Sequence, residues 1–157
     1  MQVLPATDQD KAEWLPLWRA YLDFYKQALD DEITDLTFAR ALESGENLNL
    51  LVAKSDGRIV GFATYVLHRS SWARDWYCYL EDLFVRPRFR RRGLARALLA
   101  ALAAECLDKG YTRLSWAVLN WNSDAIALYE GIGARPQSEW TTYRLSGPRL
   151  AELAGPR

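Results

Sequence analysis

A basic, glycine-containing turn between an expected strand and an expected helix constrains this chain more than any other part of its sequence. Residues 83–96 are LFVRPRFRRRGLAR, with six arginines between positions 86 and 96. The first N–H groups of a helix have no partner within the helix and point outward at the positive end of its dipole. Gly93 lets the backbone come close to a ligand, and the small Ala95 leaves that approach open. The segment therefore indicates an anion site, for which a pyrophosphate is a suitable ligand.

Two other interpretations of this turn stay open from the residues alone. A basic turn before a helix can be a solvated cap, and a cluster of arginines can bind nucleic acid. The charge is local, since residues 1–85 carry 14 acidic and 8 basic side chains, whereas residues 86–157 carry 6 acidic and 12 basic. This asymmetry favours a local anion site over a surface that binds nucleic acid.

Hydrophobic periodicity along the chain predicts a single domain over residues 1–157. Its elements follow the order βααβββαβαβ, which is typical of an α/β (α+β) fold in which helices flank a mixed central sheet. Strands are expected near residue 2 and at 48–53, 58–67, 76–85, 113–119 and 140–145. Helices are expected at about 7–25, 34–42, 92–107 and 123–130.

Several classes of protein are disfavoured by what the sequence contains. The only histidine, His68, and the two cysteines, Cys78 and Cys106, have no spacing typical of a metal site. The N-terminal decapeptide MQVLPATDQD lacks the basic start and apolar run of a signal peptide, and the longest apolar run, 97–104, is too short to span a bilayer. We therefore expect a cytoplasmic protein with reduced thiols and no bound metal.

The basic turn resembles motif A of the Gcn5-related N-acetyltransferases (GNAT), whose signature is Q/R-x-x-G-x-G/A. The signature is present here as Arg90-x-x-Gly93-x-Ala95, with alanine in place of the commoner glycine. Residues 85–90, VRPRFR, also match the V-x-P-x-aromatic-R that precedes the motif in the family. The resemblance implies a GNAT fold with a sheet of six to seven strands and acetyl-CoA as cosubstrate.

A second segment, residues 121–134, resembles motif B of the same family. The resemblance implies that Asn122 bonds the pantetheine arm and that Tyr129 lies near the thioester sulfur. It also implies that the strands expected at 76–85 and 113–119 splay apart to admit that arm. The implied cofactor-binding residues are Leu83, Phe84, Val85, Arg90, Arg91, Arg92, Gly93, Leu94, Ala95, Arg96, Asn122 and Ala125.

Two adjacent carboxylates precede the turn, and acyl transfer to an amine needs a group that takes up the amine proton. Adjacent strand residues face opposite sides, so only one of Glu81 and Asp82 is expected to face the acetyl group. Apolar neighbours raise the pKa of a buried carboxylate, and Glu81 is the predicted base, directly or through water. Structural salt bridges at both positions are the alternative. The oxyanion donor is expected to be a backbone amide near Leu83 or Phe84, at a bulge.

Residues 79–85 and 119–122, together with Trp140, resemble the spermidine/spermine and thialysine N-acetyltransferase branch of the family. The resemblance implies that Glu81 assists amine deprotonation and that Tyr129 is the general acid, whereas a helical tyrosine would otherwise be taken as a core residue. The predicted substrate-contacting residues are Asp82, Trp140 and Tyr25.

The sequence therefore predicts transfer of the acetyl group of acetyl-CoA to a primary amine of a small molecule, by direct attack in a ternary complex. A polyamine, a diamine or a lysine-like compound is the expected acceptor. A protein lysine or N-terminal acetyltransferase and a non-catalytic acyl-CoA-binding protein are the alternatives. The acidic run of Asp30, Asp31, Glu32 and Asp35 agrees with a cationic substrate and equally with a solvated loop. The resemblance suggests a homodimer, and we expect neither a nucleic acid nor a membrane as partner.

Overall fold

The computed structural model describes residues 1–155, so the last two residues of the expected 1–157 domain lie outside the described residues. Backbone contacts divide the chain into two compact units, Met1–Trp121 and Asn122–Arg157, and each unit is described by itself. The first unit holds the sheet, three α-helices and the basic turn, and the second holds two further helices.

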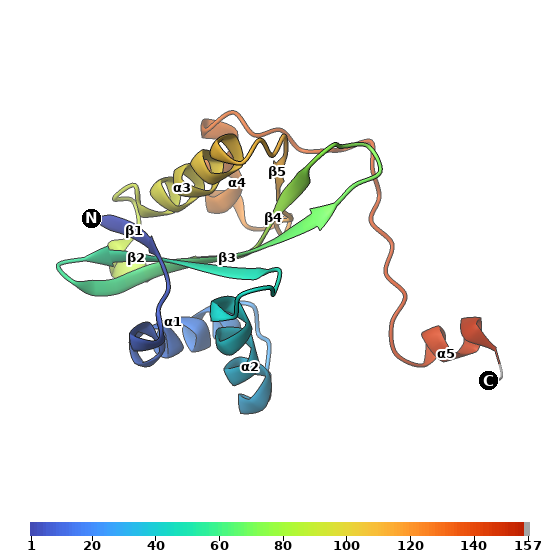
Figure 1. Ribbon diagram of the computed structural model, residues 1–157, viewed down its shortest axis with the longest axis horizontal. Helices are drawn as coiled ribbons and strands as arrows, with labels where there is room; N and C mark the ends of the chain where they lie inside the picture. The colour runs from blue at the N-terminus through green and yellow to red at the C-terminus, as the bar shows by residue number, and fades with distance from the viewer. Residues whose placement is uncertain (156–157) are drawn as a thin grey trace. The chain divides into compact units, whose positions relative to one another are not determined.

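The first unit is built on a mixed five-stranded sheet with the strands in chain order (Figure 1). All neighbouring strands pair antiparallel except the last two, which are parallel. The tight turn between the second and third strands has positive φ at Asp56 (51°) and Gly57 (76°), as a two-residue hairpin requires. The strands are β1 (Gln2–Pro5), β2 (Leu48–Ser55), β3 (Arg58–Arg69), β4 (Trp76–Val85) and β5 (Leu114–Ser115).

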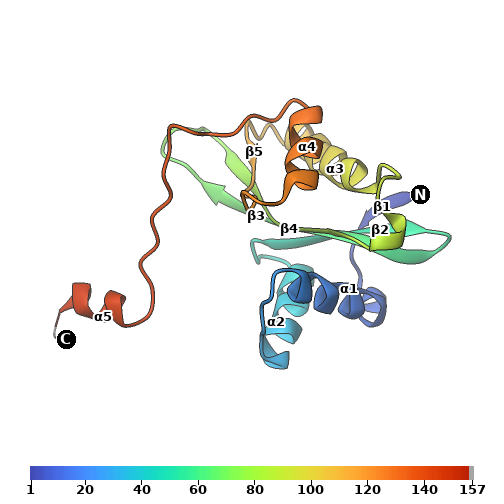
Figure 2. The ribbon, with the colours of Figure 1, turned by 180° about the vertical axis from the view of Figure 1, so that it is seen from behind.

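Helices α1 (Lys11–Phe24) and α2 (Asp31–Leu42) lie on one face of this sheet and α3 (Leu94–Asp108) on the other, as Figures 1 and 2 show from opposite sides. A short 3₁₀ turn, η1 (Asp8–Asp10), precedes α1. Aromatic rings dominate the core between α1 and the sheet, where Trp14 stacks on Trp18 with centroids 5.3 Å apart. The core cluster on this face is Trp14, Leu17, Trp18, Phe38, Leu50, Val52, Ile59, Phe62 and Phe84.

The opposite face of the sheet is covered by the apolar stripe of α3. Leu94, Leu98, Leu102 and Cys106 recur at four-residue steps and are buried, which is the pattern of a helix packed on a sheet. Gly110 (φ 74°) follows the helix, and the amide of the next residue, Tyr111, donates to the Cys106 carbonyl oxygen at 2.7 Å. This left-handed ending satisfies carbonyl groups that the helix leaves without partners.

The second unit contains α4 (Ser123–Gly131) and α5 (Pro148–Ala154). None of its described residues is buried. The strand expected at 140–145 is wrong, because these residues form no strand and all of them are exposed. A strand needs a partner as well as a suitable composition, and this segment has only the composition.

Two other expectations also need correction, and one helix was not expected. The strand expected at 113–119 is confined to β5, so the sheet has five strands in the described part of the chain rather than six to seven. Helix α2 begins at Asp31, because Asp30, in an extended conformation, precedes two acids that suit the first turn of a helix. Helix α5 had no expected counterpart.

Candidate active site

The turn between β4 and α3 has the geometry of an anion site. A 3₁₀ turn, η2 (Pro87–Phe89), is followed by Arg91 and Gly93, whose φ angles are 61° and 79°. Gly93 is the N-cap of α3, and the first α-helical hydrogen bond runs from the Ala97 amide to the Gly93 carbonyl oxygen at 2.9 Å. The amides of residues 94–96 therefore have no partner within the helix. The positive φ angles at Arg91 and Gly93 bend the backbone before them, so that the N–H groups can line a concave surface.

The backbone conformation gives a second reason for a glycine at position 93, besides the expected approach to a ligand. A Cβ atom built on it would meet no atom within 4 Å, so close packing does not exclude a side chain. Its positive φ favours glycine instead. A side chain at this position would also project beside the free amides, where a phosphate would have to sit.

Arg90 is turned toward the end of β4. Its Nε atom donates to the Val85 carbonyl oxygen at 3.1 Å, and its guanidinium lies 5.8 Å from the ring centroids of both Phe24 and Phe84. The side chain thus fixes the basic turn to the strand that precedes it. The guanidinium groups of Arg88 and Arg92 lie over the Phe89 ring at 5.0 and 5.5 Å.

Strands β4 and β5 pair over only two residues. The partners are Cys78 with Leu114 and Tyr79 with Ser115, and the Cys78 amide donates to the Arg113 carbonyl oxygen at 2.9 Å. Beyond Tyr79, residues 80–85 of β4 have no strand beside them on that side in the part of the chain that the structure describes. The end of the pairing agrees with the splaying of these two strands that the family resemblance implies, and the stretch of β4 without a neighbour is called the opening below.

Glu81 lies in a β-bulge at the edge of this opening. On β3, Thr64 pairs with Asp82 and Tyr65 pairs with Leu80, so Glu81 has no opposite residue. A bulge of this kind bends the strand and re-aims its side chains. The bulge expected near Leu83 or Phe84 therefore lies two to three residues earlier, at Glu81.

The bulge places Leu80 and Asp82 on opposite faces, although residues two apart on a regular strand share a face. Tyr65, opposite Leu80, donates a hydrogen bond of 2.5 Å to Glu105 of α3. Asp82, opposite Thr64, lies on the face of the sheet that α1 covers.

Both carboxylates at the bulge hold their protons more tightly than carboxylates in water. Burial raises the pKa of Glu81, and the neighbouring charge of Asp82 raises it further. Burial also raises the pKa of Asp82, although a hydrogen bond from Tyr21 and the nearby Thr64 hydroxyl oppose the rise. Both shifts move the groups toward the pH range in which a carboxylate exchanges protons with an amine.

Tyr21 lies in the helix expected at about 7–25 and was not among the predicted site residues. Its ring lies between Trp18 and Tyr25, with centroids 5.5 and 4.9 Å away. Burial, followed by the charge of Asp82, raises the pKa of Tyr21 well above its ordinary value. The one signal in the sequence was a tyrosine at a helical position that a phenylalanine could also occupy.

The structure brings only some of the predicted site residues together. Residues 81–85 and 90–96 and Tyr25 belong to the first unit, and Tyr25 is the C-cap residue that follows α1. In the second unit, Asn122 is the N-cap of α4 and its side chain accepts from the Ala125 amide at 3.4 Å. Tyr129 is a half-buried residue of α4, and Trp140 is 70% exposed. The roles of these residues stay predictions.

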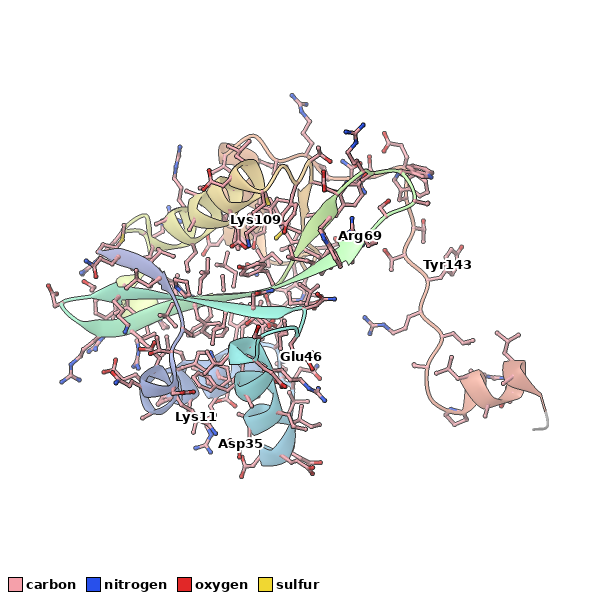
Figure 3. The ribbon with its side chains drawn as sticks, in the orientation of Figure 1. Lys11, Asp35, Glu46, Arg69, Lys109 and Tyr143 are labelled. Atoms are coloured by element: carbon pink, nitrogen blue, oxygen red, sulfur yellow. The ribbon has the colours of Figure 1, made fainter. Side chains whose placement is uncertain are left out.

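The acidic run at residues 30–35 is largely accounted for by local structure. Asp35 pairs with Lys11 of α1 at 2.9 Å, and the two side chains point toward one another in Figure 3. Asp31 lies 3.7 Å from Arg19 and stands in the first turn of α2, where a negative charge suits the helix dipole. The solvated, structural interpretation of these acids is therefore favoured over a substrate site.

Across residues 1–155, no three His, Cys, Asp or Glu side chains gather where they could hold a metal ion. None of the helices in the same range is both long and apolar enough to cross a bilayer.

A model of the acetyltransferase (GNAT) family matches residues 14–134. The chain is 30% identical to the thialysine N-epsilon-acetyltransferase of Mus musculus, over 98% of this chain and 97% of that protein. It is 44% identical to the Caenorhabditis elegans protein of the same name over 88 residues. The chain spans only a little more than half the length of that relative (54%) and of the one in Bos taurus (58%).

Solved structures share the fold. A probable acetyltransferase has a TM-score of 0.83 at 24% identity, over 93% of this chain and 97% of the other. An aminoglycoside N-acetyltransferase in complex with CoA has a TM-score of 0.78 at 20% identity, over 92% and 93% of the two chains. The α/β fold expected from the sequence is thereby confirmed, and the curated relatives confirm the resemblance to the thialysine branch.

Proposed function

The chain belongs to the acetyltransferase (GNAT) family, and from this we propose that it transfers the acetyl group of acetyl-CoA to a primary amine of a small molecule. The observation that carries the proposal is the opening beside β4. Pairing with β5 stops at Tyr79, two residues before a bulged carboxylate, and the same strand runs into a turn with free amides. Three features therefore follow one another along β4: an unpaired edge that could bind the pantetheine arm, the candidate base Glu81, and the candidate anion site at the turn.

The residues of the turn suit a pyrophosphate. The amides of Leu94, Ala95 and Arg96 precede the first α-helical hydrogen bond and would donate to phosphate oxygens. Positive φ at Arg91 and Gly93 curves the backbone around that position. Arg90 holds the turn against β4, while neighbouring arginines add positive charge. In the second unit, Asn122 and Ala125 would contact the pantetheine arm.

Glu81 is the proposed base. An alkyl amine has a pKa near 10.4 in water, so most of it is protonated at neutral pH and cannot attack a carbonyl. Burial and the adjacent Asp82 raise the pKa of Glu81, which makes it a stronger base than an ordinary carboxylate. Tyr129 is the proposed acid toward the departing thiolate, and backbone amides near Leu83 and Phe84 are the proposed oxyanion donors.

The proposed acceptor is a polyamine, a diamine or a lysine-like amine, with Asp82, Tyr25 and Trp140 in contact with it. Relatives named for thialysine and for L-ornithine N5-acetylation support a side-chain amine as the acceptor. The GNAT match over residues 14–134 crosses both compact units, which supports one acetyltransferase domain over the chain. A cytoplasmic homodimer is part of the same proposal.

The test is a screen of amines with acetyl-CoA, followed by release of free thiol. Polyamines, thialysine, lysine, ornithine and N-terminal peptides form the panel, and mass spectrometry identifies the acetylated product. We expect turnover with one of the small amines. Turnover only with peptides would favour a protein acetyltransferase, and CoA binding without any turnover would favour a non-catalytic acyl-CoA-binding protein.

A further inference from the structure

The side chain of Phe24, the last residue of α1, contacts the basic turn from outside the sheet. Its ring centroid lies 5.8 Å from the guanidinium carbon of Arg90, which is within the range of a cation–π interaction. The same guanidinium lies 5.8 Å from the Phe84 ring, and its Nε atom donates to the Val85 carbonyl oxygen at 3.1 Å. Arg90 is therefore held by two residues of β4 and by one residue of a different element.

Phe24 makes these contacts at the edge of the core rather than within it. The side chain is 38% exposed and does not belong to the core cluster between α1 and the sheet. A ring that remains this exposed adds less to core burial than the rings packed inside the cluster. Core packing alone therefore does not explain an aromatic residue at this position, whereas its contact with a cation does.

The ring of Phe24 is itself held by two neighbouring rings. The Tyr25 ring meets it edge-on at 5.0 Å, with an angle of 83° between the planes. The Trp121 ring lies 5.7 Å away at 47° and belongs to the segment that follows β5. These contacts restrict the ring and thereby fix the surface that it presents to Arg90.

A fixed guanidinium suits the binding of an anion. A free arginine side chain samples many rotamers, and ordering it on binding costs conformational entropy. The contacts of Arg90 remove part of this cost before a ligand arrives. Only the Nε–H group is used, so the remaining N–H groups can still donate to phosphate oxygens. No carboxylate within residues 1–155 pairs with Arg90, which leaves its charge available to an anion.

We propose that Phe24 is a positioning residue of the reaction: its ring holds the Arg90 guanidinium against the end of β4, with N–H groups left for the pyrophosphate of acetyl-CoA. The inference rests on the proposed function for the identity of the anion. The position of the guanidinium concerns the protein alone and can be measured without a ligand. Helix α1 would then contribute to the cosubstrate site as well as to the predicted acceptor contact at Tyr25.

The experiment uses the full chain and compares the unchanged protein with Phe24→Leu and Phe24→Tyr. Leucine keeps an apolar side chain on the helix but removes the ring, and tyrosine keeps the ring at a position where a hydroxyl can reach solvent. The first readout is the rate at which the Arg90 Nε–H proton exchanges with water, measured by ¹H–¹⁵N NMR. Loss of the signal in Arg90→Lys assigns it. The second readout is calorimetric titration with CoA.

Phe24→Leu should speed exchange of the Nε–H proton and weaken CoA binding, each by roughly two- to fivefold, the effect expected for loss of one exposed cation–π contact. Phe24→Tyr should restore both values. In the Arg90→Ala background, Phe24→Leu should cause no further loss of CoA affinity, because the group on which the ring acts is gone.

Phe89→Leu is the matched control. It removes another ring of the same turn, one that the guanidinium groups of Arg88 and Arg92 contact, and it leaves both rings beside Arg90 in place. It should leave exchange of the Arg90 Nε–H proton unchanged.

The inference is overturned if Phe24→Leu leaves either readout unchanged, or if Phe24→Tyr behaves like Phe24→Leu. It is also overturned if the loss of CoA affinity persists in the Arg90→Ala background, or if Phe89→Leu speeds the exchange as much as Phe24→Leu. Failure of the unchanged protein to bind CoA would contradict the proposed function, and the NMR readout would then decide by itself whether Phe24 positions Arg90.

Discussion

Arg90 donates a hydrogen bond from its Nε atom to the Val85 carbonyl oxygen at 3.1 Å, which fixes the basic turn to the end of β4. The same guanidinium lies over two aromatic rings, so the side chain has a structural function in addition to its positive charge. This contact bears on any test of the phosphate site, because a change at Arg90 acts on the shape of the turn as well as on its charge.

Arg90→Ala should raise the KM for acetyl-CoA and leave kcat at saturation nearly unchanged, because it disturbs binding of a part of the cosubstrate remote from the reacting atoms. Arg90→Lys keeps the charge but loses the planar donor group, and should recover only part of the affinity. Steady-state kinetics check both variants, and an unaltered KM in Arg90→Ala would remove this residue from the phosphate site.

Gly93→Ala should lower both stability and affinity for CoA. A residue with a side chain in the left-handed region costs about 1–2 kcal/mol, and φ at Gly93 is 79°. Gly110→Ala is the matched control, since Gly110 has φ 74° and equally open surroundings but follows the other end of α3. Both variants should unfold at lower temperature, whereas calorimetry should detect weaker CoA binding only for Gly93→Ala. Equal CoA affinities would contradict the assignment of the turn.

Glu81→Gln should lower kcat near neutral pH and move the rate profile toward higher pH. Glutamine cannot take up a proton, so the amine must lose its own proton to solvent before attack. The measurement is kcat as a function of pH with the best small amine. If the profile kept its shape and position, a water chain or Asp82 would be the better candidate for the base.

Tyr129→Phe should lower kcat by about 100-fold, within the range for removal of a general acid. KM should change little, because the hydroxyl acts on the leaving thiolate. Rapid-mixing measurement of thiol release separates this loss from slower binding. A variant with full kcat would return Tyr129 to a packing role in α4.

Asp82→Asn should raise the midpoint of thermal unfolding at neutral pH. Burial raises the pKa of Asp82 in the folded protein, so the unchanged protein loses stability as pH rises from the unfolded pKa through the folded one. Asparagine removes that loss and still accepts from Tyr21. The gain should disappear at pH values below those at which carboxylates ionise, and a lower unfolding temperature at neutral pH would contradict the prediction.

Local patterns in the sequence predicted most of the fold. The periods of α1 and α3, the hairpin turn before β3 and the arrangement of the basic turn each depend on a few neighbouring residues, so they follow from the sequence. The segment 140–145 shows the limit of this reasoning. Its composition suits a strand, but a strand exists only where another one pairs with it, and pairing depends on residues far away in the chain.

The arrangement of the candidate site could also be predicted only where it depends on neighbouring residues. Glu81 was predicted as the base from its neighbours and stays a prediction, but alternation could not show that a bulge at this residue turns Asp82 toward α1. The bulge is a property of the β3–β4 register, which the sequence of β4 alone does not determine. The effect of Asp82 on the pKa of Tyr21 could not be predicted, because the two residues lie 61 positions apart in the sequence.

The short pairing between β4 and β5 has a consequence for how this protein keeps its shape. Unpaired strand edges in other proteins are a hazard, since they recruit foreign chains. In the proposed function this free edge binds the pantetheine arm, so the sheet would be completed by the cosubstrate. The midpoint of thermal unfolding should then rise with acetyl-CoA concentration by mass action. The bound cosubstrate would thus contribute to the stability of the sheet and could be removed from it.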